Sequence, residues 1–225
     1  MTFTDEARKA VEQIWCQSKE HPFIVELKAG TLAPDIFRFY LIQDRYYLEQ
    51  FSKIHFKAAE LATDETIKTI FLEGVKSLEV AEISVRDTFF KELKVTEKEI
   101  LETPIAPAAY HYTAHMYREV ASNSLARIAA ALLPCYWLYQ EIGEELMKNG
   151  SPNPLYQRWI ETYESESYRE AVLRQRRLTD YLAEQTSPQE RIRMKEAFII
   201  SSYEELAFWE MAYIKQKWGL KNDEL

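Results

Sequence analysis

The sequence has little of what disulfide-rich or multidomain proteins need. Its 225 residues include only two cysteines, Cys16 and Cys135, which are too few for a disulfide framework. The 5 glycines and 8 prolines are scattered, and no Ser/Gly-rich run marks a linker between domains. We therefore predict one domain over residues 1–225 in a reducing, cytoplasmic environment.

Long apolar runs and basic clusters are also missing. No stretch reaches the roughly 18–20 apolar residues of a membrane span, and the N-terminus lacks the basic and apolar regions of a signal peptide. The formal net charge is -8, and the one basic run, from Arg174 to Arg177, is flanked by acidic residues. Binding to nucleic acid depends on clustered Lys and Arg. Neither nucleic acid nor a membrane is therefore expected as a partner.

Strand-like alternation is nearly absent, whereas apolar residues recur with helical spacing along the whole chain. The pattern predicts an all-α, single-domain, multi-helix bundle with short loops. Asp64, Thr96, Asn123 and Ser187 are the expected N-caps, and Thr96 with Glu99 and Ser187 with Glu190 have capping-box spacing. The expected helices cover residues 5–18, 23–29, 34–62, 65–93, 97–102, 107–121, 124–148, 155–163, 166–184 and 188–217.

The chain is rich in aromatic residues, with 14 Tyr, 11 Phe and 5 Trp. A tyrosine brings a polar tip into an apolar wall, which suits a pocket for a flat heteroaromatic ligand as well as an ordinary core. Tyr112 and Tyr163 lie on such apolar stretches. Each tyrosine taken alone is more often a core residue than part of a ligand wall.

The run Leu132–Tyr139 breaks a local rule inside a predicted helix. Pro134 lacks the N–H that would bond the Ala130 carbonyl, so it is expected to kink the helix. Cys135 follows at once, and it shares a helix face with Tyr139 because the two are four residues apart. A broken rule beside a nucleophile and a phenol is a pointer to function. The alternative is a kinked core helix that carries an inert thiol.

Two carboxylates lie on apolar, aromatic helix faces. Asp44 shares a face with Tyr47, and it needs either a cation or a ligand donor if it is buried; a solvent-facing ion pair is the alternative. Glu205 lies on a stripe with Phe208, whereas Glu204 is rotated about 100° away and is expected to be solvated. Burial of Glu205 should raise its pKa and make it a general acid near neutral pH.

A metal site is not indicated. The four histidines are His21, His55, His111 and His115, and the only pair with helical ligand spacing, His111 and His115, lacks the Glu of a zincin motif. No Glu-x-x-His of the di-iron bundle type occurs. We predict no metal and no cofactor. A Cys–His nucleophilic pair stays open, although no spacing nominates a histidine.

Three segments together resemble the TenA family of thiaminase II proteins, in this order and spacing: Gln43–Leu48, Ala131–Trp137 and Ser201–Trp209. The resemblance extends over nearly the whole chain, from about Phe3 to Trp218. It implies a haem-oxygenase-like helical bundle and a homotetramer. One departure is the segment Glu164–Ser167, which matches the family only loosely.

The resemblance also implies a reaction. Members of the family remove, by hydrolysis, the substituent on the methylene carbon of a 4-amino-2-methylpyrimidine. Aminomethylpyrimidine or thiamin then gives hydroxymethylpyrimidine, in thiamin salvage and degradation. Cys135 falls on the family's nucleophile and Glu205 on its acid/base residue. Asp44 falls on the carboxylate that holds the exocyclic amine. The residues that fall on the walls of the substrate pocket are Tyr47, Tyr112, Tyr139, Tyr163 and Phe208.

Two further classes of function stay open at this point. The chain could be a regulatory protein that binds a pyrimidine or a partner and carries Cys135 as an inert thiol. It could also be a metal or haem oxygenase, although none of the four histidines has a context that nominates an axial ligand.

Overall fold

A computed structural model describes the backbone of residues 1–219 and their side chains other than those of residues 81–87. All regular elements in this range are helices, which confirms the all-α prediction. None of them combines the length and apolar character needed to cross a bilayer. The elements are α1 Phe3–Ala10, α2 Glu12–Lys19, α3 Pro22–Ala29, α4 Pro34–Leu61, α5 Glu65–Ser84, the π-helix η1 Val85–Phe90, α6 Glu97–Glu102, α7 Pro107–Ala121, α8 Leu125–Met147, α9 Pro154–Glu164, α10 Glu166–Glu184 and α11 Pro188–Ile214.

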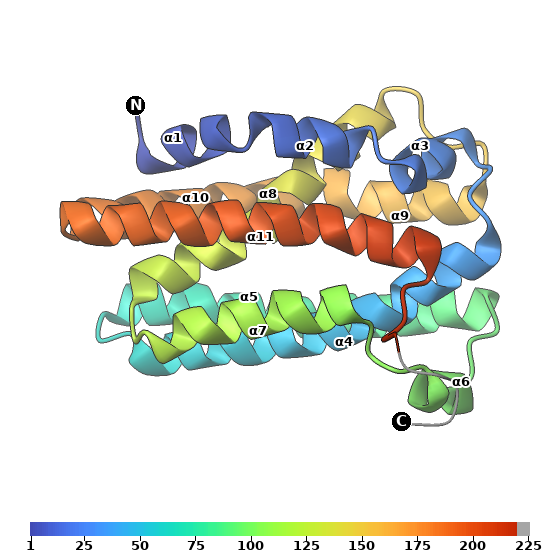
Figure 1. Cartoon of the computed structure of the whole chain (residues 1–225), viewed down its shortest axis with the longest axis horizontal. Coiled ribbons are helices and arrows are strands. Elements are labelled where there is room, and N and C mark those ends of the chain that lie inside the picture. Colours follow the sequence, from blue (N-terminus) through green and yellow to red (C-terminus); the bar gives the residue numbers. More distant parts are fainter. Residues whose placement is uncertain (220–225) are drawn as a thin grey trace.

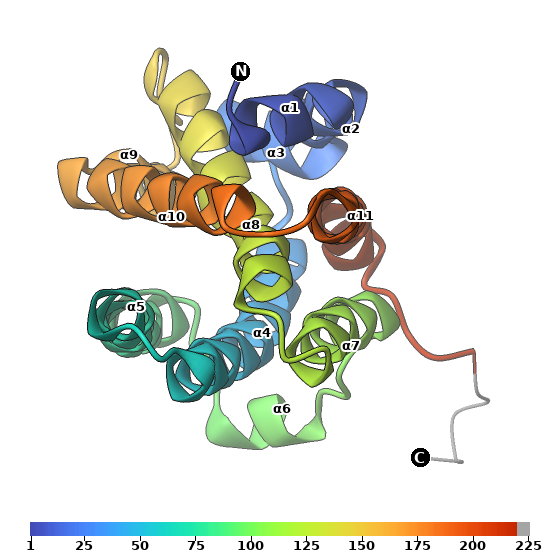
Figure 2. The ribbon, with the colours of Figure 1, turned by 90° about the vertical axis from the view of Figure 1, so that its left-hand side faces the viewer.

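The helix α8 runs through the middle of the bundle. It contacts α4, α7, α9, α10 and α11, and the end-on view shows it crossing between these helices (Figure 2). In the side view, α4, α5 and α7 form the lower part of the molecule and α1 to α3 its upper edge, with α11 between them (Figure 1). Residues on α8 therefore face other helices on nearly every side.

The helix α4 buries a stripe of large side chains. Pro34 occupies its first turn, where the missing N–H costs nothing. Phe37, Tyr40, Asp44 and Tyr47 then follow at intervals of three and four residues, and all four are buried. This stripe places a carboxylate between aromatic rings inside the bundle.

Close approach of α8 and α9 depends on Gly143. A Cβ at this position would lie 3.0 Å from the carbonyl carbon and from Cβ of Tyr163. The absence of a side chain lets the two helix backbones meet. Tyr163 is thereby brought beside the α8 residues Cys135 and Tyr139.

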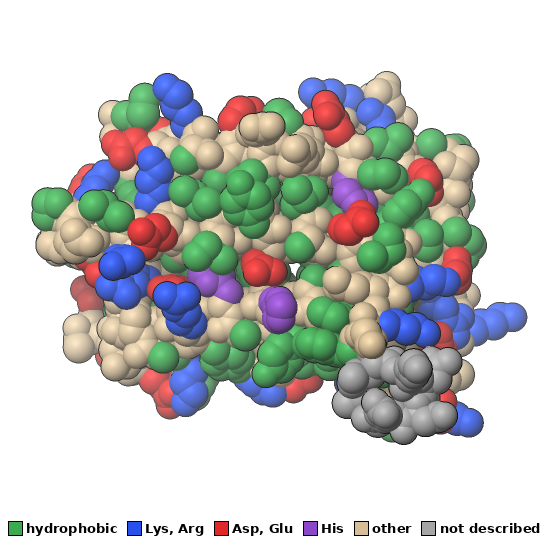
Figure 3. Space-filling model, viewed as in Figure 1, with side chains coloured by type: hydrophobic (Ala, Val, Ile, Leu, Met, Phe, Trp, Pro, Cys, Tyr) green, Lys and Arg blue, Asp and Glu red, His purple; other side chains and the backbone are tan. Residues whose placement is uncertain are grey.

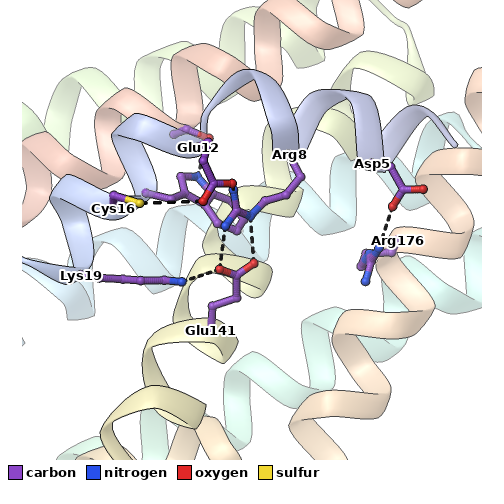
Figure 4. A network of polar contacts seen from close by, with 9 residues as sticks. Asp5, Arg8, Glu12, Cys16, Lys19, Glu141 and Arg176 are labelled. Carbon is purple, nitrogen blue, oxygen red and sulfur yellow. Dashed lines mark hydrogen bonds and ion pairs between the residues drawn. The ribbon is translucent and has the colours of Figure 1, made fainter. Parts of the chain in front are cut away.

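An ion-pair network attaches the N-terminal helices to α8 (Figure 4). Arg8 donates two hydrogen bonds to Glu141 at 2.8 and 2.9 Å, and Lys19 donates to the same carboxylate at 2.6 Å. The guanidinium of Arg8 also lies 4.3 Å from the ring centroid of Trp15. Nearby, Arg176 of α10 covers the ring of Trp137 at 3.8 Å. These contacts fix the outer face of α8.

Charges of both signs are interspersed on the face formed by α7 and α11 (Figure 3). Hydrophobic side chains lie between them. This mixed face differs from the continuous basic surface that binding to nucleic-acid phosphates requires.

Several predicted helix boundaries are wrong because tertiary contacts override the local pattern. The helix expected over residues 5–18 is broken at Val11 (φ -109°, ψ 12°). Ala7, Val11 and Trp15 are all fully buried, so the break keeps both halves packed on the bundle. The helix expected over 65–93 is α-helical only to Ser84 and continues as η1. The last helix ends at Ile214, where Lys215 adopts a left-handed conformation.

The caps are confirmed in part. Asp64 accepts from the backbone N–H groups of Thr66 and Ile67, as predicted. Asn123 is not a cap: it has φ 54°, and Ser124 caps α8 instead. Thr96 and Ser187 each accept from the expected backbone N–H. The carboxylates expected to complete these two capping boxes bind arginines instead, Glu99 with Arg38 and Glu190 with Arg127.

Candidate active site

The eight residues predicted for the site come from five helices and meet in one region of the bundle. The pKa of the Cys135 thiol is shifted by three of these residues, namely Asp44, Tyr47 and Glu205. The pKa of the Tyr163 hydroxyl is likewise raised by Asp44, Cys135 and Glu205. The positions are Asp44 and Tyr47 on α4, Tyr112 on α7, Cys135 and Tyr139 on α8, Tyr163 on α9, and Glu205 and Phe208 on α11.

The Cys135 thiol is held in its neutral form in the free protein. Burial raises its pKa well above the usual value, and the nearby carboxylate of Glu205 raises it further. The hydroxyl of Tyr47 acts in the opposite direction. Unlike the carboxylates around it, Cys135 keeps part of its surface accessible. Forming the thiolate therefore requires that the proton of the thiol move to a neighbouring group.

Glu205 is the neighbour suited to take that proton. It is 2 % exposed, and it accepts a hydrogen bond of 2.7 Å from the hydroxyl of Tyr112. Burial raises its pKa to about 8, although the Tyr112 and Cys135 donors lower it in part. The predicted direction of this shift is confirmed. A carboxyl with a pKa near neutral can both accept a proton and return it.

Glu204 is not fully solvated, contrary to expectation. It is half-buried, and burial raises its pKa, while the nearby His111 lowers it. Glu205, Tyr47 and Asp44 are the groups that shift the pKa of Cys135, whereas Glu204, one helix position along, is turned about 100° from Glu205. Glu204 is therefore a natural control for Glu205.

Asp44 is a buried carboxylate that no cation neutralises among the described residues. It is 6 % exposed, which excludes the solvent-facing ion pair considered above. Burial alone raises its pKa to about 7. An ionised carboxylate in such a place is costly unless it is hydrogen-bonded. Asp44 is thus suited to accept hydrogen bonds from N–H groups of a ligand.

Two groups of aromatic rings surround these polar side chains. In the first, the ring of Tyr47 lies 4.9 Å from Tyr112 and 5.6 Å from Phe208, centroid to centroid. In the second, Tyr163 lies 4.9 Å from Tyr139 and 4.8 Å from Trp159. These rings form an aromatic surround for the thiol and the two carboxyls, of the kind that favours stacked or edge-on contact with another planar group.

Sequence reasoning missed Tyr168. Its ring meets Tyr163 edge-on at 5.4 Å, and Cys135 and Tyr163 both influence its hydroxyl. Tyr168 follows the segment Glu164–Ser167, where the family resemblance is loosest, so no motif pointed to it. Tyr40 is also close to Asp44, and its hydroxyl and the Trp209 Nε1 are buried without partners among the described residues. Unpaired buried polar atoms are typical of a place that a ligand or water completes.

The described residues contain no group of three or more His, Cys, Asp or Glu side chains placed to hold a metal ion. His115, one of the pair with ligand spacing, lies 3.2 Å from the Ala197 carbonyl oxygen and donates to it through Nε2. The chemistry available here is that of a thiol, two carboxyls and phenols.

The two buried carboxyls predict a specific pH dependence of stability. Their folded pKa values, about 7 and about 8, lie above the values of 3.8 and 4.5 for exposed groups. The folded chain therefore binds more protons than the unfolded chain between about pH 4 and pH 8, and this contribution to stability is lost as pH rises through that window.

We expect the free energy of unfolding of Asp44→Asn, which cannot ionise, to rise by roughly 1–3 kcal/mol relative to that of wild type between about pH 5 and pH 8. Urea unfolding of both proteins at pH 5 and pH 8 measures the difference in their free energies of unfolding. A difference that does not change with pH would contradict the prediction.

The fold and the site define a class of protein: an all-helical bundle that encloses a thiol, two buried carboxyls and a group of aromatic rings. The chain matches the model of the TENA/THI-4/PQQC family over residues 8–215, and it belongs to this family.

Named relatives and solved structures agree with this assignment. The aminopyrimidine aminohydrolase of Bacillus subtilis is 41% identical over 97% of this chain and 93% of its own length. The enzyme of the same name from Helicobacter pylori is 33% identical over 90% of this chain and 94% of its own length. A TenA homologue from P. horikoshii superposes with a TM-score of 0.83 at 30% identity, covering 95% of this chain and 99% of that one. The TenA-like, haem-oxygenase-like bundle predicted from sequence is thus confirmed.

Proposed function

We propose that this protein is an aminopyrimidine aminohydrolase that releases 4-amino-5-hydroxymethyl-2-methylpyrimidine from aminomethylpyrimidine or thiamin in thiamin salvage. The observation that carries the proposal is the pair of buried carboxyls, Asp44 and Glu205, beside the thiol of Cys135. An aminopyrimidine has an exocyclic amine that donates hydrogen bonds and ring nitrogens that accept a proton. It therefore complements two buried oxygen sites, one an acceptor and one an acid.

The first half of the reaction activates the ring. The Cys135 proton passes to Glu205 and from there to a ring nitrogen, while the sulfur forms a bond to the adjacent ring carbon. The lone pair of the exocyclic amine then expels the substituent from the methylene carbon, so that ammonia leaves when the substrate is an alkylammonium. Positive charge develops on the exocyclic nitrogen at this step, and the carboxylate of Asp44 stabilises it.

The second half restores the ring. Water adds to the exocyclic methylene carbon and loses a proton, which gives the hydroxymethyl group. The carbon–sulfur bond breaks as Glu205 takes back the proton of the ring nitrogen and returns it to the Cys135 sulfur. The net change is exchange of the amine for hydroxyl, with one water consumed.

Product analysis tests the proposal. The purified protein is incubated separately with 4-amino-5-aminomethyl-2-methylpyrimidine and with thiamin, and the products are separated by chromatography. Formation of the hydroxymethylpyrimidine from at least one of them supports the proposal, and the ratio of kcat/KM values identifies the preferred leaving group. If neither compound is hydrolysed, the proposed activity is wrong.

Asp44→Asn is expected to weaken binding and turnover together. An amide offers one acceptor and one donor, so it loses a charge-assisted hydrogen bond to the exocyclic amine and sets a donor against a donor. The affinity for the hydroxymethylpyrimidine should fall about 10- to 100-fold, and kcat should fall as well because the charge on the amine grows in the transition state. Calorimetry and steady-state kinetics measure the two effects. Unchanged affinity would remove Asp44 from the binding site.

A regulatory role is the second candidate, because one structural relative is described as a TenA family transcription regulator: the Silicibacter protein, with TM-score 0.86 and 26% identity over 94% of this chain and 96% of that one. On that hypothesis the site binds a pyrimidine without turnover and Cys135 is inert. The product analysis above separates the two. The family resemblance also supports a homotetramer, which sedimentation analysis would test, and a cytoplasmic location stays a prediction.

A further inference from the structure

The turn of α8 that carries Cys135 lacks a backbone hydrogen bond. Pro134 has no N–H, so the Ala130 carbonyl loses its donor four residues ahead. A helix opened in this way bends readily. A nucleophile at this point nevertheless has to be aimed closely, because a displacement of about 1 Å can cost a factor of about 10² in rate. Contacts from outside α8 must therefore hold the turn.

Two buried hydrogen bonds hold this turn, one from each of two other helices. Ser201 Oγ of α11 donates to the Ala131 carbonyl at 2.7 Å. The Tyr136 hydroxyl lies 2.8 Å from Nε2 of His55 on α4. Both Ser201 and His55 are fully buried. The segment from Ala131 to Tyr136, which includes Cys135, is thus tied to α11 at one end and to α4 at the other.

The surroundings of His55 fix the direction of its hydrogen bonds. Its Nδ1 lies 2.8 Å from the Phe51 carbonyl oxygen, which can only accept, so Nδ1 carries the proton. Burial lowers the pKa of His55 to about 4, so the ring is neutral at physiological pH. Nε2 is therefore an acceptor, and the Tyr136 hydroxyl donates to it.

The packing around the ring is also specific. A Cβ at Gly74 of α5 would lie 2.6 Å from Cδ2 of His55, so only glycine leaves room for the ring. Glycine inside a helix costs roughly 0.5–1 kcal/mol relative to alanine. The ring of Phe51 meets His55 edge-on, at 4.7 Å between centroids. His55 is held in one place and one protonation state.

We propose that His55 and Ser201 are positioning residues that hold the Pro134 turn and aim the Cys135 thiol at the bound ring. This inference rests on the proposed function. His55 acts through Tyr136, and Ser201 acts through the Ala131 carbonyl. Their loss should therefore lower kcat and leave the affinity for the pyrimidine unchanged.

The test compares His55→Leu, Tyr136→Phe, their double variant and Ser201→Ala. We expect kcat to fall about 10- to 100-fold in all four, with KM and the affinity for the hydroxymethylpyrimidine within about threefold of wild type. Each single change at His55 or Tyr136 leaves a buried polar partner unpaired and should lower the melting temperature, whereas the double variant removes both partners and should recover it. The double variant should not recover kcat, which separates positioning from stability.

Two controls complete the experiment. His55→Gln keeps an acceptor for Tyr136 and should restore most of kcat relative to His55→Leu. Ser202→Ala removes a buried serine on the same helix whose partners are Trp15 and the Phe198 carbonyl, so it should lower stability without lowering kcat. The wild-type protein could turn over the substrate while the double variant and Ser201→Ala keep an unchanged kcat. That result would overturn this inference and leave the proposed function standing. Absence of wild-type turnover would overturn the proposed function, and the inference with it.

Discussion

Replacing Cys135 by serine is expected to abolish hydrolysis while the bundle remains folded. Serine fits the space of cysteine, so packing around the residue is kept. The hydroxyl, however, gives up its proton far less readily than a thiol, and its oxygen is a weaker nucleophile toward an aromatic ring. In the proposed mechanism the thiol, whose pKa is raised by burial, passes its proton to Glu205 before it attacks. An alcohol in the same place cannot complete that transfer, and kcat should fall on the order of 10³-fold or more.

The second cysteine is the matched control for this change. Cys16 is exposed on α2, where its sulfur lies 3.8 Å from a carboxylate oxygen of Glu12 (Figure 4). Cys16→Ser should leave kcat and KM close to wild type. Circular dichroism and melting temperature verify that both variants are folded. Turnover of Cys135→Ser within tenfold of wild type would remove the covalent step from the mechanism.

Glu205→Gln is expected to give the other large loss. Glutamine keeps the shape of the side chain and can still accept from Tyr112, but it cannot receive a proton from Cys135 or deliver one to the ring. Proton transfer by a positioned acid or base contributes about 10²–10⁴ in rate, and kcat should fall by that factor. Binding of the hydroxymethylpyrimidine should be largely kept. Steady-state kinetics and calorimetry measure the two quantities on the same preparation.

Glu204→Gln is the control for Glu205→Gln, because it makes the same chemical change one helix position away. It should cost little in kcat, since the charged neighbour that acts on Glu204 is His111 of α7. If Glu204→Gln were the crippling change and Glu205→Gln the silent one, the assignment of acid and base would be wrong.

Much of the fold could be predicted from local pattern alone. The helix α10 has the predicted bounds, Glu166 to Glu184, and α4 begins at the predicted Pro34. Local sequence patterns gave wrong predictions where a side chain distant in sequence provides the contact. The carboxylate of Glu99 does not complete the predicted capping box, because it binds Arg38, which lies 61 residues away in sequence. The break at Val11 likewise depends on what the N-terminal helices pack against.

Part of the candidate site could be predicted from the sequence. Helical spacing placed Asp44 with Tyr47 and Glu205 with Phe208, and burial of all four agrees with those faces. Spacing could not place Tyr168, nor could it pair His55 with Tyr136, because these contacts join separate helices. The raised pKa of the Cys135 thiol also follows only from the three-dimensional arrangement, because burial raises it most and the neighbouring Glu205 raises it further.

Differential alkylation tests most directly whether the pyrimidine binds at Cys135. The folded protein is treated with iodoacetamide at mildly alkaline pH, with and without saturating hydroxymethylpyrimidine, and modification of each cysteine is followed by peptide mass spectrometry. Cys16 is the internal reference, because it is exposed on α2, a helix that carries none of the site residues. We expect the ligand to slow modification of Cys135 at least about tenfold, since a bound ring covers the sulfur, and to leave modification of Cys16 unchanged. Equal modification of Cys135 with and without ligand would contradict this expectation.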